Sequence, residues 1–189
     1  MKKALAMILA LCMMALLFCG CDREEDTSTD SVVPPVESEV ETLTVQDVKD
    51  SITEIGDTFG YANAISSAGT KELDGNAVLH NFNIFNNALS LLVTEKDGVV
   101  EEIIVGGYWM DFKSGGKSDE EAIDMVTSVS LLAIRSCTGA GDQLDLEDKL
   151  LATTPVKNGE YTNYEYSQNG WSYQLVVGPD VVSIAAWPK

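Results

Sequence analysis

The chain has 189 residues, with 12 lysines and arginines against 30 aspartates and glutamates, and a formal net charge of −18. Binding along a nucleic-acid backbone depends on basic side chains that replace counterions, so this balance excludes nucleic acid as a main partner. The same charge is repelled by anionic lipid headgroups, which excludes a basic membrane-binding surface.

The first 20 residues have the organisation of an export signal. Lys2 and Lys3 form a short basic start, residues 4–18 are all apolar, and Gly20 is a small residue at the end. These are the three parts of a secretory signal peptide. Because a membrane-spanning helix needs about 20 apolar residues, the short run predicts a signal that is removed and not a permanent span.

The end of the apolar run, Leu17 to Cys21 (LFCGC), resembles the lipobox of bacterial lipoproteins. The resemblance implies that Cys21 receives diacylglycerol on its sulfur and that the chain is cut between Gly20 and Cys21. Acyl chains such as palmitate would then hold the mature protein on the cell membrane, facing outside the cytoplasm. Cleavage there removes Lys2 and Lys3 and no acid, which brings the net charge to −20.

Cys19 and Cys21 have an alternative interpretation as a metal or redox pair. Zinc and redox cysteine pairs are separated by at least two residues, and zinc needs further cysteine or histidine ligands. Here one residue separates the cysteines, and His80 is the only histidine. We therefore predict lipidation of Cys21, and neither a metal site nor a cofactor.

The remaining chain divides into an acidic stalk and one domain. Residues 22–43 hold eight acids, one base and Pro34-Pro35. The segment has too few large apolar side chains for their burial to offset the entropy lost on folding. We therefore expect residues 21–43, which begin with the lipidated cysteine, to be a disordered stalk. Residues 44–189 are long enough for a single globular domain.

Three helices are predicted in this domain. Thr44 and Asp47 mark a helix start, followed by an apolar face that includes Ile52 and Phe59. Ser118 and Glu121 form a capping box before a second helix, whose apolar stripe ends at Cys137. A short acidic helix is expected at residues 144–151.

The strands are predicted from apolar alternation and turn signals. Residues 76–85 alternate, residues 89–105 are two β-rich runs joined at Asp97-Gly98, and residues 160–177 turn at Asn169-Gly170. Residues 181–187 form a last run. The order predicts an α+β fold with an antiparallel sheet of about six strands in two helix-plus-meander halves (αβββ-ααβββ) and helices on one face.

The hairpin at Asn169-Gly170 provides the candidate ligand-binding residues. Its register places four aromatic side chains on one face: Tyr164, Tyr166, Trp171 and Tyr173. Aromatic side chains on a sheet can stack on sugars or anchor a peptide. The opposite face is polar, with Glu165 and Gln174, which favours the alternative that the aromatics are core.

No catalytic residue is predicted. His80 alternates with apolar neighbours and Cys137 ends an apolar stripe, so we expect both to be structural. The chain is therefore expected to be a noncatalytic binding or assembly module of the cell envelope, acting on an envelope protein or glycan. An envelope hydrolase that uses two acidic residues in one cleft is the main alternative, and a small-solute receptor is a further one.

Overall fold

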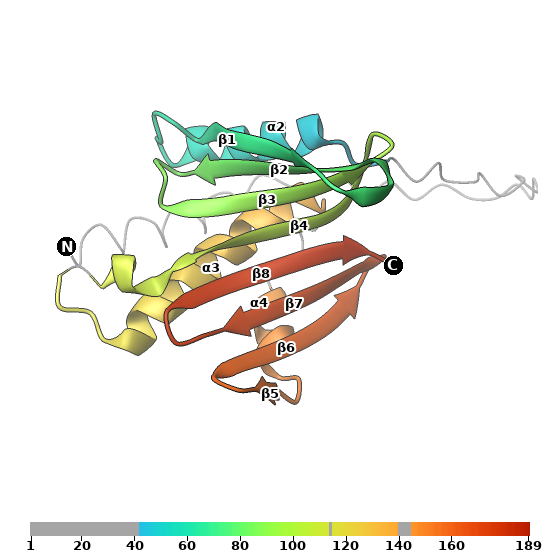
Figure 1. The fold of residues 1–189 in the computed structure, drawn as a ribbon. Helices are drawn as coiled ribbons and strands as arrows, with labels where there is room; N and C mark the ends of the chain where they lie inside the picture. Colours follow the sequence, from blue (N-terminus) through green and yellow to red (C-terminus); the bar gives the residue numbers. More distant parts are fainter. Residues whose placement is uncertain (1–41, 114, 140–144) are drawn as a thin grey trace, which may run out of the picture. The chain divides into compact units, whose positions relative to one another are not determined.

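The computed structural model describes residues 42–113, 115–139 and 145–189 (Figure 1). The predicted signal peptide, Gly20, Cys21 and most of the predicted stalk lie outside the described residues. The helices are α2 (Val45–Thr58), η2 (Asp74–Asn76), η3 (Trp109–Phe112), α3 (Asp119–Cys137) and α4 (Leu146–Leu151). The strands are β1 (Ile65–Glu72), β2 (Ala77–Ile84), β3 (Leu89–Lys96), β4 (Val99–Tyr108), β5 (Val156–Asn158), β6 (Tyr161–Gln168), β7 (Trp171–Val177) and β8 (Val181–Pro188).

The described strands form one antiparallel sheet of eight strands, in the order β1-β2-β3-β4-β8-β7-β6-β5 (Figure 1). The prediction of about six strands in two halves (αβββ-ααβββ) is therefore wrong, although a sheet-rich α+β fold was expected. The two strands that we did not predict, β1 and β5, are the two edges of the sheet. An edge strand buries few side chains, so its sequence lacks the apolar alternation by which a strand is recognised.

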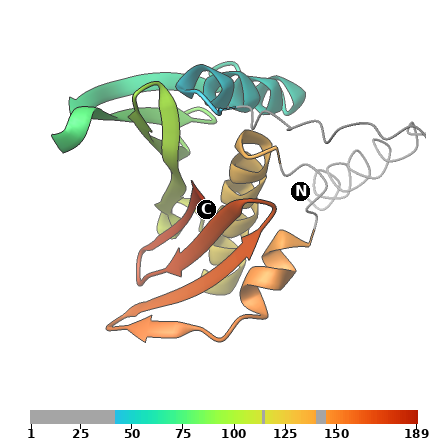
Figure 2. The ribbon, with the colours of Figure 1, turned by 90° about the vertical axis from the view of Figure 1, so that its right-hand side faces the viewer.

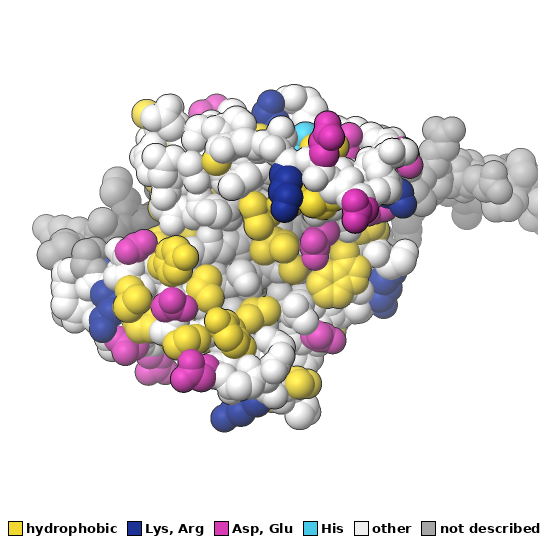
Figure 3. All heavy atoms as spheres, in the orientation of Figure 1, with side chains coloured by type: hydrophobic (Ala, Val, Ile, Leu, Met, Phe, Trp, Pro, Cys, Tyr) yellow, Lys and Arg dark blue, Asp and Glu magenta, His cyan; other side chains and the backbone are white. Residues whose placement is uncertain are grey.

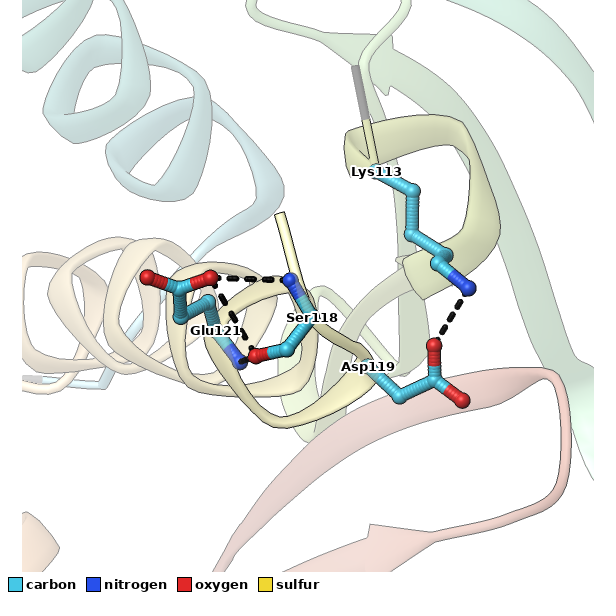
Figure 4. A network of polar contacts seen from close by, with 4 residues as sticks. All are labelled: Lys113, Ser118, Asp119 and Glu121. Carbon is cyan, nitrogen blue, oxygen red and sulfur yellow. Dashed lines mark hydrogen bonds and ion pairs between the residues drawn. The ribbon is translucent and has the colours of Figure 1, made fainter. Parts of the chain in front are cut away.

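The helices begin where the capping signals predict. Thr44 Oγ accepts a hydrogen bond from the Asp47 N–H at 3.2 Å, and Asp47 accepts one from the Thr44 N–H at 2.8 Å. Ser118 and Glu121 make the same pair of bonds at 3.2 and 2.8 Å (Figure 4). An ion pair between Lys113 and Asp119 links η3 to the start of α3 (Figure 4).

The two predicted hairpin turns are confirmed. Asp97 and Gly98 have φ angles of 52° and 84°, and Asn169 and Gly170 have φ angles of 50° and 78°. Positive φ at both central residues is the two-residue turn that suits the twist of a hairpin. The second turn pairs Gln168 with Trp171 and Tyr166 with Tyr173, which is the predicted register.

The described helices α2, α3 and α4 lie on one side of the sheet (Figure 2). Alternate strand residues on this side form the core with the helices, among them Leu91, Ile103 and Ile184, each fully buried. Phe59 is 45 % exposed and follows the last residue of α2, so the predicted apolar face of that helix ends one turn earlier. The opposite side of the sheet is not covered by any of these helices.

Candidate functional site

The four aromatic candidates lie on the helix side of the sheet. Tyr173 has no exposed surface and belongs to the core, and Tyr164, Tyr166 and Trp171 are partly buried against that core. The hydroxyl of Tyr173 lies 3.4 Å from the Thr138 Oγ, at the end of α3. This side of the hairpin is therefore the packing side, and its aromatic rings are used mainly inside the protein.

A polar network fixes α4 over the rim of this aromatic face. Lys149 Nζ donates to Gln168 Oε1 at 2.8 Å and lies 5.7 Å from the ring centre of Tyr166. The Tyr166 hydroxyl donates to the same Gln168 oxygen at 3.0 Å. Lys149 also pairs with Asp145 at 2.7 Å, and this hydrogen bond raises the pKa of Lys149 and lowers that of Asp145.

His80 and Cys137 have structural surroundings. His80 Nε2 lies 3.0 Å from Glu95 Oε2, and its ring stacks on Phe82 with 6.2 Å between ring centres. Cys137 is buried, and its Sγ lies 4.0 Å from the Val48 carbonyl oxygen. Burial raises the pKa of the Cys137 thiol to about 12, so the thiol is protonated at neutral pH and a poor nucleophile.

The hydrolase alternative requires two carboxylates in one cleft. Of the four main pockets in the described part of the chain, three are lined by one acid each, Asp111, Glu54 or Asp47, and the fourth by none. The carboxylate whose pKa is raised, mainly by burial, is Glu147, which lies in none of these pockets. Residues 42–113, 115–139 and 145–189 also contain no group of three histidine, cysteine or acidic side chains that could hold a metal ion.

The side of the sheet opposite the helices carries an apolar row across its centre. Ile103 and Val105 are fully buried toward the helices, so Ile104 between them points to the other side. Ile104 pairs with Leu92 on β3 and with Ala185 on β8, and all three are partly exposed. Figure 3 shows hydrophobic side chains gathered over this part of the sheet. We call this surface the helix-free face.

The apolar part of the helix-free face has a polar flank. Val176, Val181 and Trp187 extend the apolar row and are partly exposed, and Tyr108 beside Val181 is 60 % exposed. Toward the β5 edge the side chains are polar and bond to one another. Gln174 Nε2 donates to Glu165 Oε1 at 2.8 Å, and the hydroxyls of Ser167 and Ser172 are 3.0 Å apart.

A pocket of about 280 Å³ opens on the helix-free face beside Gly106. A Cβ atom on Gly106 would lie 2.5 Å from the Val182 carbonyl oxygen, so only glycine fits where β8 approaches β4. The pocket is lined by Leu92, Ile104 and ten further residues, Gly106 among them. Asp111 is the one charged residue of that lining, and it makes no ion pair with any described residue.

Comparisons of the chain with models of protein families, with curated proteins and with solved structures find no match. None of the described helices has both the length and the apolar character needed to cross a membrane.

Sequence reasoning did not find the helix-free face. The predicted aromatic candidates lie on the β6–β7 hairpin, whose outer side is polar, while the middle of the apolar row comes from β3, β4 and β8. The signal was the near-continuous apolar run in each of these strands, such as Ile103-Ile104-Val105. Such a run shows that both sides of a strand are apolar, and does not show which side a helix covers.

Proposed function

We propose that the protein is a lipoprotein of the cell envelope, anchored through acyl chains on Cys21, whose domain is a noncatalytic binding module. The lipobox supports the anchor, and two or more acyl chains hold a protein firmly where a single chain does not. The acidic stalk keeps the domain away from the anionic membrane surface. The binding surface in this proposal is the helix-free face.

The observation that carries the proposal is the exposed apolar row with its pocket. Leu92, Ile104 and Ala185 occupy the middle of a sheet whose other side is already filled by the core. A contiguous apolar surface with a polar flank is the composition of a protein interaction site. An envelope protein is favoured over a glycan, because the middle of the face is aliphatic and its aromatic side chains, Tyr108 and Trp187, lie at the ends of the apolar row.

The charges define the partner further. Asp111 is the only charged residue that lines the pocket, and the chain from Cys21 onward has a net charge of −20. A partner that places an apolar side chain in the pocket and a lysine or arginine beside it would complement both features. Such a pair of opposite charges also speeds the encounter of two proteins.

The test is photo-crosslinking in the cells that produce the protein. A photoreactive amino acid is placed at Ile104, and in a control at Lys157, an exposed position on the edge strand β5. We expect a crosslinked protein from position 104 alone, and loss of it when Asp111→Asn is added to a chain that still folds. Equal crosslinking from both positions, or none from position 104, contradicts the proposal.

A further inference from the structure

The two edges of the sheet differ in how they are protected. β5 has only three residues, and a short edge offers little backbone for pairing with another chain. β1 has eight residues, seven of them exposed, contains no proline and pairs only with β2. The backbone of β1 therefore leaves a row of hydrogen-bonding groups open to a further strand.

The bonds to β2 show which residues of β1 turn toward the open edge. The Phe85 N–H donates to the Ala64 carbonyl at 2.9 Å, and Ser66 and Ser67 then pair with Asn83 and Phe82 without a register shift. In an antiparallel pair, alternate residues direct their backbone groups to the partner strand. Ala64 and Ser66 therefore face β2, and the N–H and C=O groups of Ser67 face outward, just before the bulge between Ser67 and Gly69.

A groove of about 590 Å³ runs between this part of β1 and helix α2. Figures 1 and 2 show α2 alongside the β1 edge of the sheet. The groove is lined by Val45, Gln46 and Lys49 of α2, by residues 65–67 of β1, and by His80 and Phe82 of β2. Every second side chain of a strand added to β1 would point into it.

The charges of the groove are opposite in sign to those of the chain as a whole. Lys49 is its one permanent cation, and no acid is part of its lining. The Nζ of Lys49 makes a 3.4 Å hydrogen bond to Gln46 Oε1 but no ion pair with any residue that the structure describes. His80 in the wall is already bonded to Glu95. Lys49 is thus available to a carboxylate of a ligand.

We propose that β1 and α2 form a second binding site, which takes an extended peptide as an additional strand of the sheet, with an apolar side chain over Phe82 and an acidic side chain at Lys49. In this mode the backbone of β1 supplies affinity and the groove supplies specificity. The site is separate from the helix-free face and does not depend on the function proposed for it.

The test uses short random peptides displayed on phage, selected on the purified full chain. We expect enriched peptides in which an apolar residue and an aspartate or glutamate are two positions apart, so that both side chains point into the groove. Synthetic versions should bind the Ser67→Pro variant about tenfold more weakly, because proline removes an outward N–H group without touching the bonds to β2. Binding to Lys49→Gln should fall by about two- to fivefold, while Lys157→Gln on the opposite edge should bind normally.

Two results would overturn the site: no enrichment on the wild-type chain, or enriched peptides that bind Ser67→Pro as tightly as the wild type. If circular dichroism shows that Ser67→Pro is unfolded, equal binding by Lys49→Gln and Lys157→Gln overturns it. An Ile104→Asp variant, which alters the helix-free face, should bind the peptides normally. The peptide assay therefore tests the β1–α2 site independently of the function proposed for the helix-free face.

Discussion

The close approach of β8 to β4 at Gly106 can be tested by whether Gly106→Ala raises or lowers the free energy of unfolding. A strand glycine normally costs about 0.5–1 kcal/mol relative to alanine, so Gly106→Ala would stabilise the protein if space were available. The structure places the added Cβ 2.5 Å from the Val182 carbonyl oxygen and 2.7 Å from the Ser183 Cβ. Strand β8 is held on both sides, by β4 and β7, and cannot move away without breaking its pairing.

We therefore expect Gly106→Ala to lower the free energy of unfolding by about 1–3 kcal/mol, the usual cost of overpacking. The neighbouring Gly107→Ala is the comparison variant, because its Cβ would meet the Leu89 Cδ2 at 2.8 Å and the Ala88 carbonyl oxygen at 3.3 Å, so its nearest contacts are not with β8. The assay is urea unfolding followed by the fluorescence of Trp109, Trp171 and Trp187. A Gly106→Ala protein as stable as the wild type, or more stable, would refute the packing of β8 described above.

Three further predictions concern the core, a helix cap and the buried thiol. Tyr173→Ala should lower the free energy of unfolding by about 3–5 kcal/mol in the same assay, whereas Val176→Ala on the helix-free face should cost much less; a mild effect at Tyr173 would place that ring outside the core. Hydrogen bonds from Ser118 lower the pKa of Glu121 in the folded protein. The Glu121 carboxylate therefore adds to the free energy of unfolding at pH values above its ordinary pKa of 4.5, and this stabilisation is lost as the pH falls through the folded-state pKa. Glu121→Gln should thus lower the urea midpoint at about pH 7 and leave it unchanged at about pH 2.5, and an equal loss at both pH values would contradict the cap. Cys137 should react with a thiol reagent only after unfolding, and rapid reaction of the native chain would show that the thiol is accessible.

Local signals in the sequence were enough to place the helices and turns. The capping boxes at Thr44 and Ser118 and the turn at Asn169-Gly170 depend on bonds and φ angles within a few residues, and the structure has them. Such features can be predicted from sequence because they depend only on the types of a few neighbouring residues and their spacing.

The edge strands and the candidate surface depend on distant parts of the chain and could not be read in this way. In β1, the run Ser66-Ser67-Ala68-Gly69 has no apolar alternation, and only its pairing with β2 makes it a strand. Ile104 lies in an apolar run whose two sides look alike in sequence. Which side is covered is decided by where α3 packs, and that is a property of the whole fold.

The central claim, a lipid-anchored protein of the cell envelope, is tested most directly by labelling with a radioactive fatty acid in the producing cells. We expect label in the wild-type chain and in a Cys19→Ala variant, which keeps Cys21 and the small residue before it. A Cys21→Ala variant should carry no label and should accumulate as the uncleaved precursor. Label that persists in Cys21→Ala, or an unlabelled wild-type chain, would contradict the account.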